Sequence, residues 1–333
     1  MKLKKPIAAK KYFKIILILP IVIFLSFLAW DTFFDLYKIA RECSPHGYSK
    51  DKYLAYCEND NYGDYEHGAF FLNQEPEAIQ NLKASEVIFL GNSRMQFAFS
   101  NSSTENFFKN ALSSQPYYLF GFGYAEYYTF SLNLIKELKL KPKVLVVAVD
   151  ERYFEKGMSP PAQFVETSPT ALPNYEAKKL KQRMHSYVCN QLEPASLRWN
   201  CGDSKTIYRH RSTGAWETSH FRKAENFPFE LSQKIDEVAF EKFRDAAKDL
   251  VQKSNVPSEC IIFTSAPIEK WSAKGTDALA KSSGVNSIEQ NLKSKWATQD
   301  KSHLIPEDAL AFTENILPLM KPIFEKCGVR FKK

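Results

Sequence analysis

The residues of this 333-residue chain that could do chemistry lie in polar or glycine-rich loops that follow apolar segments. The first such loop is the tetrapeptide GNSR at 91–94, which comes directly after the apolar run VIFL at 87–90. A serine at the end of a strand projects its hydroxyl into the crevice above a sheet, and its own backbone N–H can stabilise an oxyanion. Serine is a weak nucleophile until a base takes its proton. Ser93 is therefore a candidate nucleophile that requires a partner.

The candidate base lies near the C-terminus, in the sequence DKSH at 300–303. His303 can take the serine proton, and Asp300 can hold the imidazole in the required tautomer and stabilise the imidazolium. The loop Gly121-Phe122-Gly123 lets backbone N–H groups approach a substrate carbonyl without a Cβ in the way. The sequence thus predicts a nucleophile, a base, an orienting carboxylate and oxyanion donors.

These residues must be positioned by a common scaffold. Apolar segments predict strands at 87–90, 117–120, 144–149 and 260–264, and helical patterns predict helices at 124–139, 233–254 and 306–326. Strands that alternate with helices predict an α/β fold with three layers, in which a mainly parallel sheet is flanked by helices. Ligands bind such sheets at the carboxyl ends of the strands, where the polar loops are.

The charge is concentrated at the N-terminus. The chain carries a net charge of +7, but residues 1–14 hold six lysines and no acidic residue. The remainder has 39 basic and 38 acidic residues, so no basic field covers the fold and nucleic-acid binding is not expected.

A membrane anchor is predicted directly after this basic tail. Residues 15–30 carry no charge, and the segment 15–34 is long enough to span about 30 Å of bilayer. Lysines on its N-terminal side place that end in the cytoplasm, so the rest of the chain is expected outside it. The end of the segment lacks the small-x-small pattern of a cleaved signal peptide. We expect one transmembrane helix, a stalk or N-terminal wrap at 35–84, and a domain at 85–333 with an insertion or lid at about 151–228.

An even number of cysteines agrees with an exported domain. The six are Cys43, Cys57, Cys189, Cys201, Cys260 and Cys327. Short spacings suggest the pairs Cys43/Cys57 and Cys189/Cys201, which leaves Cys260/Cys327. No cysteine and histidine cluster has zinc-ligand spacing, so no metal and no cofactor are expected.

The order of these motifs resembles the SGNH (GDSL-like) hydrolase superfamily, over residues 85–154 and 258–325. The block DKSHLIPEDALAFTENILP is particularly similar to the last block of that family. The resemblance implies a flavodoxin-like fold, with Ser93 as nucleophile, His303 as base and Asp300 as its partner. It implies that the Ser93 and Gly123 amides, with Gly121 less favoured than Gly123, donate to the oxyanion.

The chain departs from the family in two places. Asn92 stands where the family's GDS form has Asp, and the usual Asn of the third block is missing, with Asp150 or Arg152 at the equivalent strand end. An anionic Asp150 could not donate to an oxyanion, so the identity of a further donor stays open.

A glycan can also stack on aromatic and Arg side chains. The candidate substrate-binding residues are Asn92, Arg94, Asp150, Arg152, Arg211 and Trp216.

The family acts on acyl groups of lipids, sugars and polysaccharides, and exported branches modify envelope glycans, some alongside a membrane-bound O-acyltransferase. The resemblance therefore suggests a serine esterase or O-acetyltransferase at the bacterial inner membrane, with its domain in the periplasm. Its substrate would be an acylated glycan or a lipid-linked saccharide. The same basic tail and apolar segment would also fit a type II membrane anchor in a eukaryotic secretory organelle. The alternative is a non-catalytic protein of the same fold that binds a glycan or an assembly partner.

Overall fold

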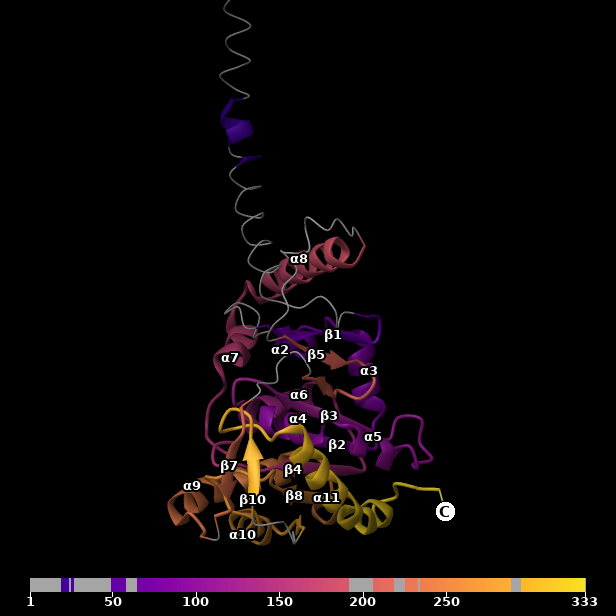
Figure 1. Ribbon diagram of the computed structural model, residues 1–333, viewed down its shortest axis with the longest axis vertical. Helices are drawn as coiled ribbons and strands as arrows, with labels where there is room; N and C mark the ends of the chain where they lie inside the picture. The colour runs from indigo at the N-terminus through magenta and orange to yellow at the C-terminus, as the bar shows by residue number, and fades with distance from the viewer. Residues whose placement is uncertain are drawn as a thin grey trace, which may run out of the picture.

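The structure is a computed structural model that describes residues 19–23, 25–26, 49–57, 65–191, 206–218, 225–232, 234–288 and 295–332. A central sheet carries helices on both of its faces, and the long helix α8 (Ala171–Gln191) lies at one end of the molecule (Figure 1). The α/β class predicted from the alternation of strands and helices is confirmed.

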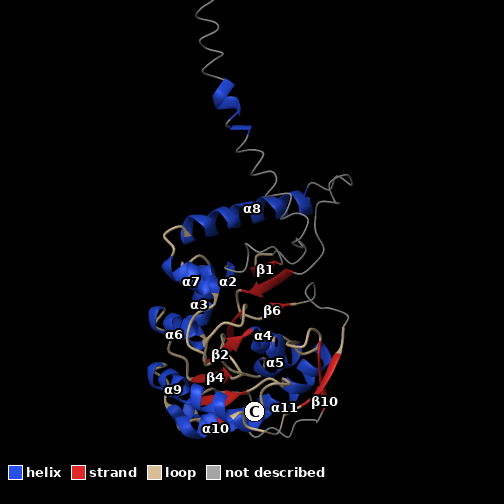
Figure 2. Ribbon diagram, turned by 90° about the vertical axis from the view of Figure 1, so that its left-hand side faces the viewer, coloured by secondary structure: helices blue, strands red, loops and turns tan. Residues whose placement is uncertain are grey.

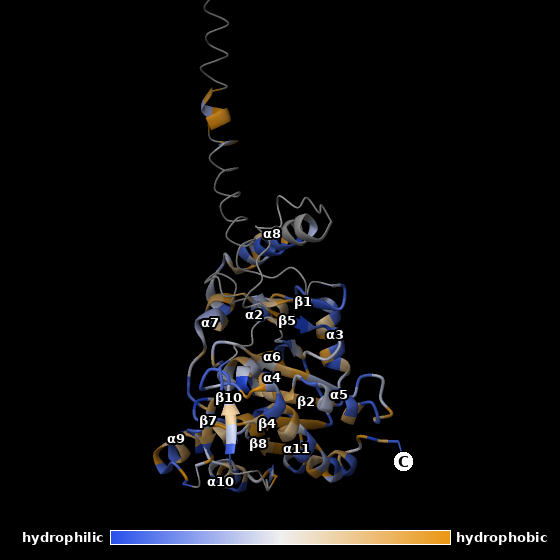
Figure 3. Ribbon diagram, in the orientation of Figure 1, coloured by the Kyte–Doolittle hydropathy of each residue, from blue (hydrophilic) through white to orange (hydrophobic). Residues whose placement is uncertain are grey.

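Five parallel strands form the central sheet in the order β3-β2-β4-β8-β9. Their bounds are β2 Val87–Asn92, β3 Tyr117–Phe122, β4 Val144–Ala148, β8 Ile261–Thr264 and β9 Asn286–Ser287. The first four are buried along their whole length because helices cover both sides, which explains their continuous apolar sequences (Figure 3).

Alternate side chains of each strand point to opposite faces, and each face has its own group of helices (Figure 2). Ile88 and Leu90 pack toward one face, and Val87 and Phe89 toward the other. The first face carries α3 Pro76–Ala84, α6 Tyr128–Glu137, α9 Glu237–Lys253 and α10 Ala273–Ser283; the second carries α4 Ser93–Phe99, α5 Ser102–Phe108 and α11 Pro306–Lys326.

Several of the predicted boundaries are wrong. The helix expected at 124–139 begins only at Tyr128, because Tyr124 and Ala125 adopt positive φ angles of 58° and 50° that a right-handed helix cannot contain. The strands expected to end at residues 90 and 120 continue to Asn92 and Phe122, so Gly91 and Gly121 lie inside β2 and β3 and not in loops.

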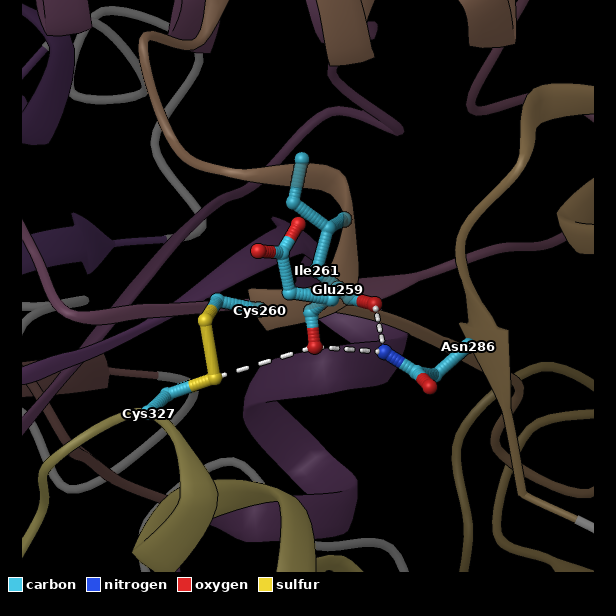
Figure 4. The surroundings of a disulfide bond; sticks show 5 residues. All are labelled: Glu259, Cys260, Ile261, Asn286 and Cys327. Carbon is cyan, nitrogen blue, oxygen red and sulfur yellow. Dashed lines mark hydrogen bonds between the residues drawn. A yellow bond between two sulfur atoms is a disulfide. The ribbon is translucent and has the colours of Figure 1, made fainter.

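The last helix is tied to the sheet by a covalent bond. The structure contains the predicted Cys260–Cys327 disulfide, which joins the residue just before β8 to the residue just after α11 (Figure 4). The side chain of Asn286 donates to the carbonyls of Glu259 and Ile261 beside it. Cys57 is also disulfide-bonded. The predicted pairs Cys43/Cys57 and Cys189/Cys201 involve side chains outside the described part.

A smaller antiparallel sheet joins two segments that were predicted to be separate, the N-terminal segment 35–84 and the insertion 151–228. Its order is β1-β5-β6, so a strand from the segment 35–84 pairs with strands from the insertion 151–228. The bounds are β1 Lys52–Cys57, β5 Thr206–His210 and β6 Trp216–Glu217, with α2 Tyr65–Phe71 and α7 Pro160–Thr167 packed nearby. A further pair joins β7 Phe227–Glu230 to β10 Lys295–Thr298, and the short 3₁₀ helix η2 spans Ser258–Cys260.

The predicted anchor at 15–34 lies mostly outside the described residues. Within it, residues 19–23 and 25–26 are helical and exposed. Across the ranges that the structure describes, no helix combines the length and the apolar character needed to cross a bilayer. The basic tail at 1–14 falls outside these ranges.

Candidate active site

The candidate nucleophile lies at the junction of β2 and α4. β2 ends at Asn92 and α4 begins at Ser93, so the serine leaves the sheet at the carboxyl end of a central strand. The side-chain oxygen of Asn92 accepts the Arg94 N–H at 3.0 Å and caps the helix. A glycine is required at position 91, because a Cβ there would stand 2.5 Å from the Cβ of Met95 in α4. This close strand-to-helix turn fixes the direction of the Ser93 side chain.

His303 lies within hydrogen-bond distance of both residues that were predicted to act with it. His303 Nε2 lies 2.8 Å from Ser93 Oγ, and His303 Nδ1 lies 2.7 Å from Asp300 Oδ2. The serine and the histidine are 210 residues apart in the chain. This is the order of contacts of a nucleophile, a general base and the carboxylate that orients the base.

Asp300 is held as an anion by its own loop. Burial raises the pKa of this carboxyl, but the hydrogen bonds from the His303 ring and from the His303 and Ser302 backbone outweigh burial and lower it. Its second oxygen accepts the backbone N–H groups of Ser302 at 3.0 Å and His303 at 2.8 Å. Lys301 takes a φ of 66°, which lets the loop return so closely. The carboxylate therefore stays charged where an imidazolium would form.

The phenyl ring of Phe97 packs against the imidazole ring of His303. Its ring centroid lies 4.2 Å from that of His303, with 31° between the planes. Phe97 follows Ser93 by four residues, so α4 presents the hydroxyl and the phenyl ring on one face. We did not single out Phe97 from the sequence; the spacing of four residues after a candidate nucleophile is the signal that could have found it.

Comparison of the chain with protein-family models, with curated proteins and with solved structures finds no match. The chemistry of the site therefore follows from its own residues. Within the described part of the chain, no group of three or more His, Cys, Asp or Glu side chains is arranged to hold a metal ion.

The two glycines expected as oxyanion donors, Gly121 and Gly123, make structural contacts in the fold. The Gly123 N–H donates to Glu66 Oε1 at 2.5 Å, so this donor is already engaged. The Gly121 carbonyl accepts from Gln96 and Arg209, and a Cβ at Gly121 would lie 3.0 Å from the carbonyl oxygen of Asn92. Gly121 thus serves the close packing of β3 against the turn at Ser93, and the Gly123 N–H is bound to Glu66.

Glu66 belongs to a buried charge network that we did not anticipate. Its Oε2 accepts from Arg209 Nη1 at 3.1 Å and from the Trp216 indole at 3.2 Å. Arg209 has no exposed surface and also donates to the Leu119 and Gly121 carbonyls. Burial raises the pKa of Glu66, and the charge of Arg209 opposes that rise. With three donors on one carboxylate, Glu66 ties α2 to the end of β3 and to β5 and β6.

A second buried contact, next to the first in the sequence, links α2 to α7. His67 Nε2 lies 2.8 Å from Glu126 Oε2, and the same carboxylate accepts from the Ser159 hydroxyl and N–H. Burial raises the pKa of Glu126, but the bonds to His67 and Ser159 outweigh burial and lower it below its ordinary value of 4.5.

Glu126→Gln should therefore change how stability depends on pH. A carboxyl with a lowered pKa in the fold stabilises it above its ordinary value, and this contribution is lost as the pH falls through the lowered value. We expect the free energy of unfolding of the variant to lie furthest below that of the native chain near pH 7, with the gap narrowing below pH 4.5. Urea unfolding at several pH values measures this gap, and a gap that stays constant from pH 7 to pH 3 would contradict it.

Four residues near the nucleophile form a connected polar cluster. Asn92 Nδ2 donates to Asp150 Oδ2 at 2.6 Å, and Arg94 Nη1 lies 3.2 Å from the same oxygen. Arg94 also makes a two-pronged contact with Glu151, with Nη2 donating to Oε1 at 2.8 Å. Asp150 Oδ1 accepts two backbone N–H groups of its own loop. Asn92, Arg94 and Asp150, predicted to bind substrate, thus hold one another.

The remaining candidate substrate-binding residues do not converge on the triad. Arg152 donates to the Tyr127 hydroxyl and pairs with Glu155. Arg211 is bound to Glu75 at 2.9 Å and to backbone carbonyls before β1. Trp216 is only 4% exposed and packs edge-on against Phe97. Trp216 and Arg211 are therefore structural parts of the small sheet and not an open glycan surface.

A cavity of about 530 Å³ opens beside the polar cluster of Asn92, Arg94, Asp150 and Glu151, at the carboxyl ends of β4 and β8. Glu151 forms part of its wall, so the cavity lies against the Arg94–Glu151 pair. Its other walls come from the segment that leads into α9 and the loop that leads into α10. They are Ser232, Lys234, Ile235, Asp236, Ala239, Glu269, Lys270, Trp271, Ser272 and Gly275. Carboxylates, ammonium groups and hydroxyls dominate this lining, and it suits a ligand rich in hydrogen-bonding groups better than an alkyl chain.

Proposed function

We propose that this protein is a serine acyl-ester enzyme that carries an acyl group on Ser93. The observation that supports it best is the pair of contacts at His303, with Ser93 on one ring nitrogen and Asp300 on the other. The strand order, in which the first two strands of the sheet exchange places, is that of flavodoxin-like folds. This order agrees with the resemblance to the SGNH superfamily.

The reaction follows from the three side chains. Ser93 Oγ attacks the ester carbonyl carbon while His303 Nε2 takes its proton, and Asp300 stabilises the imidazolium that results. The bond between the carbonyl carbon and the leaving oxygen then breaks, and His303 returns the proton to that oxygen. The acyl group is now on Ser93. Water or a sugar hydroxyl completes the cycle by the same steps in reverse, which gives hydrolysis or transfer respectively.

The oxyanion needs donors other than Gly123. The Ser93 N–H is one candidate, because it belongs to the nucleophile itself. Asn92 Nδ2 is the other: it carries two hydrogens, and Asp150 accepts one of them. Compared with the family's pattern, the Asp before the nucleophile and the Asn of the third block have exchanged places. The pair is still joined by a hydrogen bond of 2.6 Å between amide and carboxylate.

The sequence supports a place for this chemistry. The lysine-rich tail and apolar segment before residue 35 favour a single-pass anchor, with the catalytic domain on the outer face of the bacterial inner membrane. The disulfide Cys260–Cys327 suits an oxidising compartment such as the periplasm. We propose an acetylated envelope glycan or lipid-linked saccharide as substrate and a membrane-bound O-acyltransferase as partner.

Covalent labelling tests the proposal directly. The full-length protein should hydrolyse an aryl acetate and react with a fluorophosphonate, and peptide mass spectrometry should find the phosphonyl group on Ser93. Reaction at another serine, or none, would overturn the assignment.

The engaged Gly123 N–H favours one alternative, a non-catalytic protein of this fold that binds a glycan or an assembly partner. Such a protein would bind an acetylated oligosaccharide without turnover. Ser93→Ala would then leave its cellular role intact.

Filling the cavity beside Glu151 should impair large substrates selectively. Ala239→Trp places an indole into this space from the first turn of α9. We expect the ratio of kcat/KM for an acetylated oligosaccharide to kcat/KM for an aryl acetate to fall at least about tenfold, because the clash affects only the larger ligand. Val238→Trp is the matched control, since Val238 is the preceding residue and is 81% exposed. An unchanged ratio in Ala239→Trp would show that the sugar lies elsewhere.

A further inference from the structure

A single guanidinium joins the loops that carry the proposed catalytic groups. Arg94 is the residue after the nucleophile, and its Nε donates to Ser302 Oγ at 3.1 Å. Ser302 is the residue before the base. The two terminal nitrogens of Arg94 hold both carboxylate oxygens of Glu151, after β4. Arg94 therefore bridges the turn after β2, the loop after β4 and the loop 300–303.

The geometry of the bridge requires arginine. Arg94 uses three of its nitrogens in different directions, and its side chain is mostly buried. A guanidinium is planar and always charged, and its fork matches a carboxylate, whereas a lysine ammonium is a single point donor. Lysine at this position could hold Glu151 or Ser302 but not both in the same geometry.

The loop 300–303, which carries the proposed base, is closed by its own hydrogen bonds and is joined to α4 by further contacts. Asp300 accepts the Ser302 and His303 N–H groups, and the Gln299 N–H donates to the His303 carbonyl. These bonds set the shape of the loop and not its distance from α4. The contact of Ser302 with Arg94 joins it to α4 beside the nucleophile, and it adds to the contact of His303 with Phe97.

We propose that Arg94 is a positioning residue, which sets the distance between His303 and Ser93 by holding Ser302 against Glu151. The proposal rests on the catalytic function proposed above. It gives Arg94 a role that differs from substrate binding: its loss should lower kcat and leave KM nearly unchanged, because ground-state contacts with the substrate are not removed.

The test combines kinetics with a structural measurement. Arg94→Ala should lower kcat for an aryl acetate about 100-fold with KM within threefold, because a misplacement of about 1 Å costs that much. Arg94→Lys should recover little of this loss. Ser302→Ala should lower kcat about three- to tenfold, and in the double variant it should add nothing to Arg94→Ala. Ethylguanidinium in the buffer should partly restore Arg94→Ala, whereas ethylammonium should not. Arg244→Ala, on the surface of α9, is the control.

Three outcomes would overturn the proposal: a rise in KM without a fall in kcat, multiplicative losses in the double variant, or an unchanged Ser93 Oγ to His303 Nε2 distance in a crystal structure of Arg94→Ala. We expect that distance to grow by about 1 Å from the present 2.8 Å. The distance decides the role of Arg94 even if the native protein shows no turnover. An absence of turnover would contradict the proposed function but would leave the structural role of Arg94 open to the distance measurement.

Discussion

Ser93→Ala and His303→Ala should each lower kcat for an aryl acetate at least about 10⁴-fold, and the double variant should lose no more than either single one. The two side chains act as a unit through the 2.8 Å contact between Oγ and Nε2, so removing either abolishes the attack that both perform. Steady-state hydrolysis and the rate of fluorophosphonate labelling measure the two losses.

Asp300→Asn tests the role of the carboxylate that contacts the His303 ring. Asparagine keeps the shape of the side chain but can donate to Nδ1, which favours the wrong imidazole tautomer, so we expect a loss of about 10⁴-fold. Ser103→Ala, at a partly exposed serine bonded to Glu314, is the control for the serine change and should leave kcat unaffected. Losses that multiply in Ser93→Ala/His303→Ala would mean that the two residues act independently.

The second large effect is on stability. Arg209→Met should lower the free energy of unfolding by about 3–5 kcal/mol, because it leaves the Glu66 carboxylate buried without its countercharge and removes two donors from the Leu119 and Gly121 carbonyls. Urea unfolding followed by tryptophan fluorescence measures the loss.

Two further variants separate the charge from the packing. Arg209→Met/Glu66→Gln should recover part of the loss, since no unpaired charge stays buried. Lys52→Met removes a partly exposed partner of Glu217 and should cost less than about 1 kcal/mol. A loss at Arg209 as small as that at Lys52 would show that the buried pair contributes little.

The parts of the fold that the sequence predicted are those with strong local signals. Continuous apolar runs of four to six residues predicted β2, β4 and β8. The polar residues after the first run indicated Ser93, and the sequence DKSH ahead of the last helix indicated Asp300 and His303. The helix 233–254 was predicted nearly in full; it begins at Glu237 because the Asp236 carboxylate accepts the Ala239 N–H and caps it.

The parts that we did not predict depend on contacts between distant segments. β9 has two residues and β7 and β10 have four each, too few for a period to emerge. Glu66 lies 57 residues before the Gly123 N–H that it binds, and 143 residues before Arg209. A carboxylate in a short helical segment gives no local sign of such partners. The same reason explains why Arg211 and Trp216, which looked like a surface for sugars, make structural contacts instead: Arg211 binds Glu75, and Trp216 is buried.

The pairing of β1 with β5 has a practical consequence for truncation. A shortened chain that begins after Cys57 would turn β5 into an open edge, with unpaired backbone groups beside the strand that carries Trp216. Trp216 supports Phe97, and Phe97 supports the imidazole, so damage at that edge would reach His303. Shortened versions of the chain should therefore start ahead of Lys52, even though Ser93, Asp300 and His303 lie far beyond it.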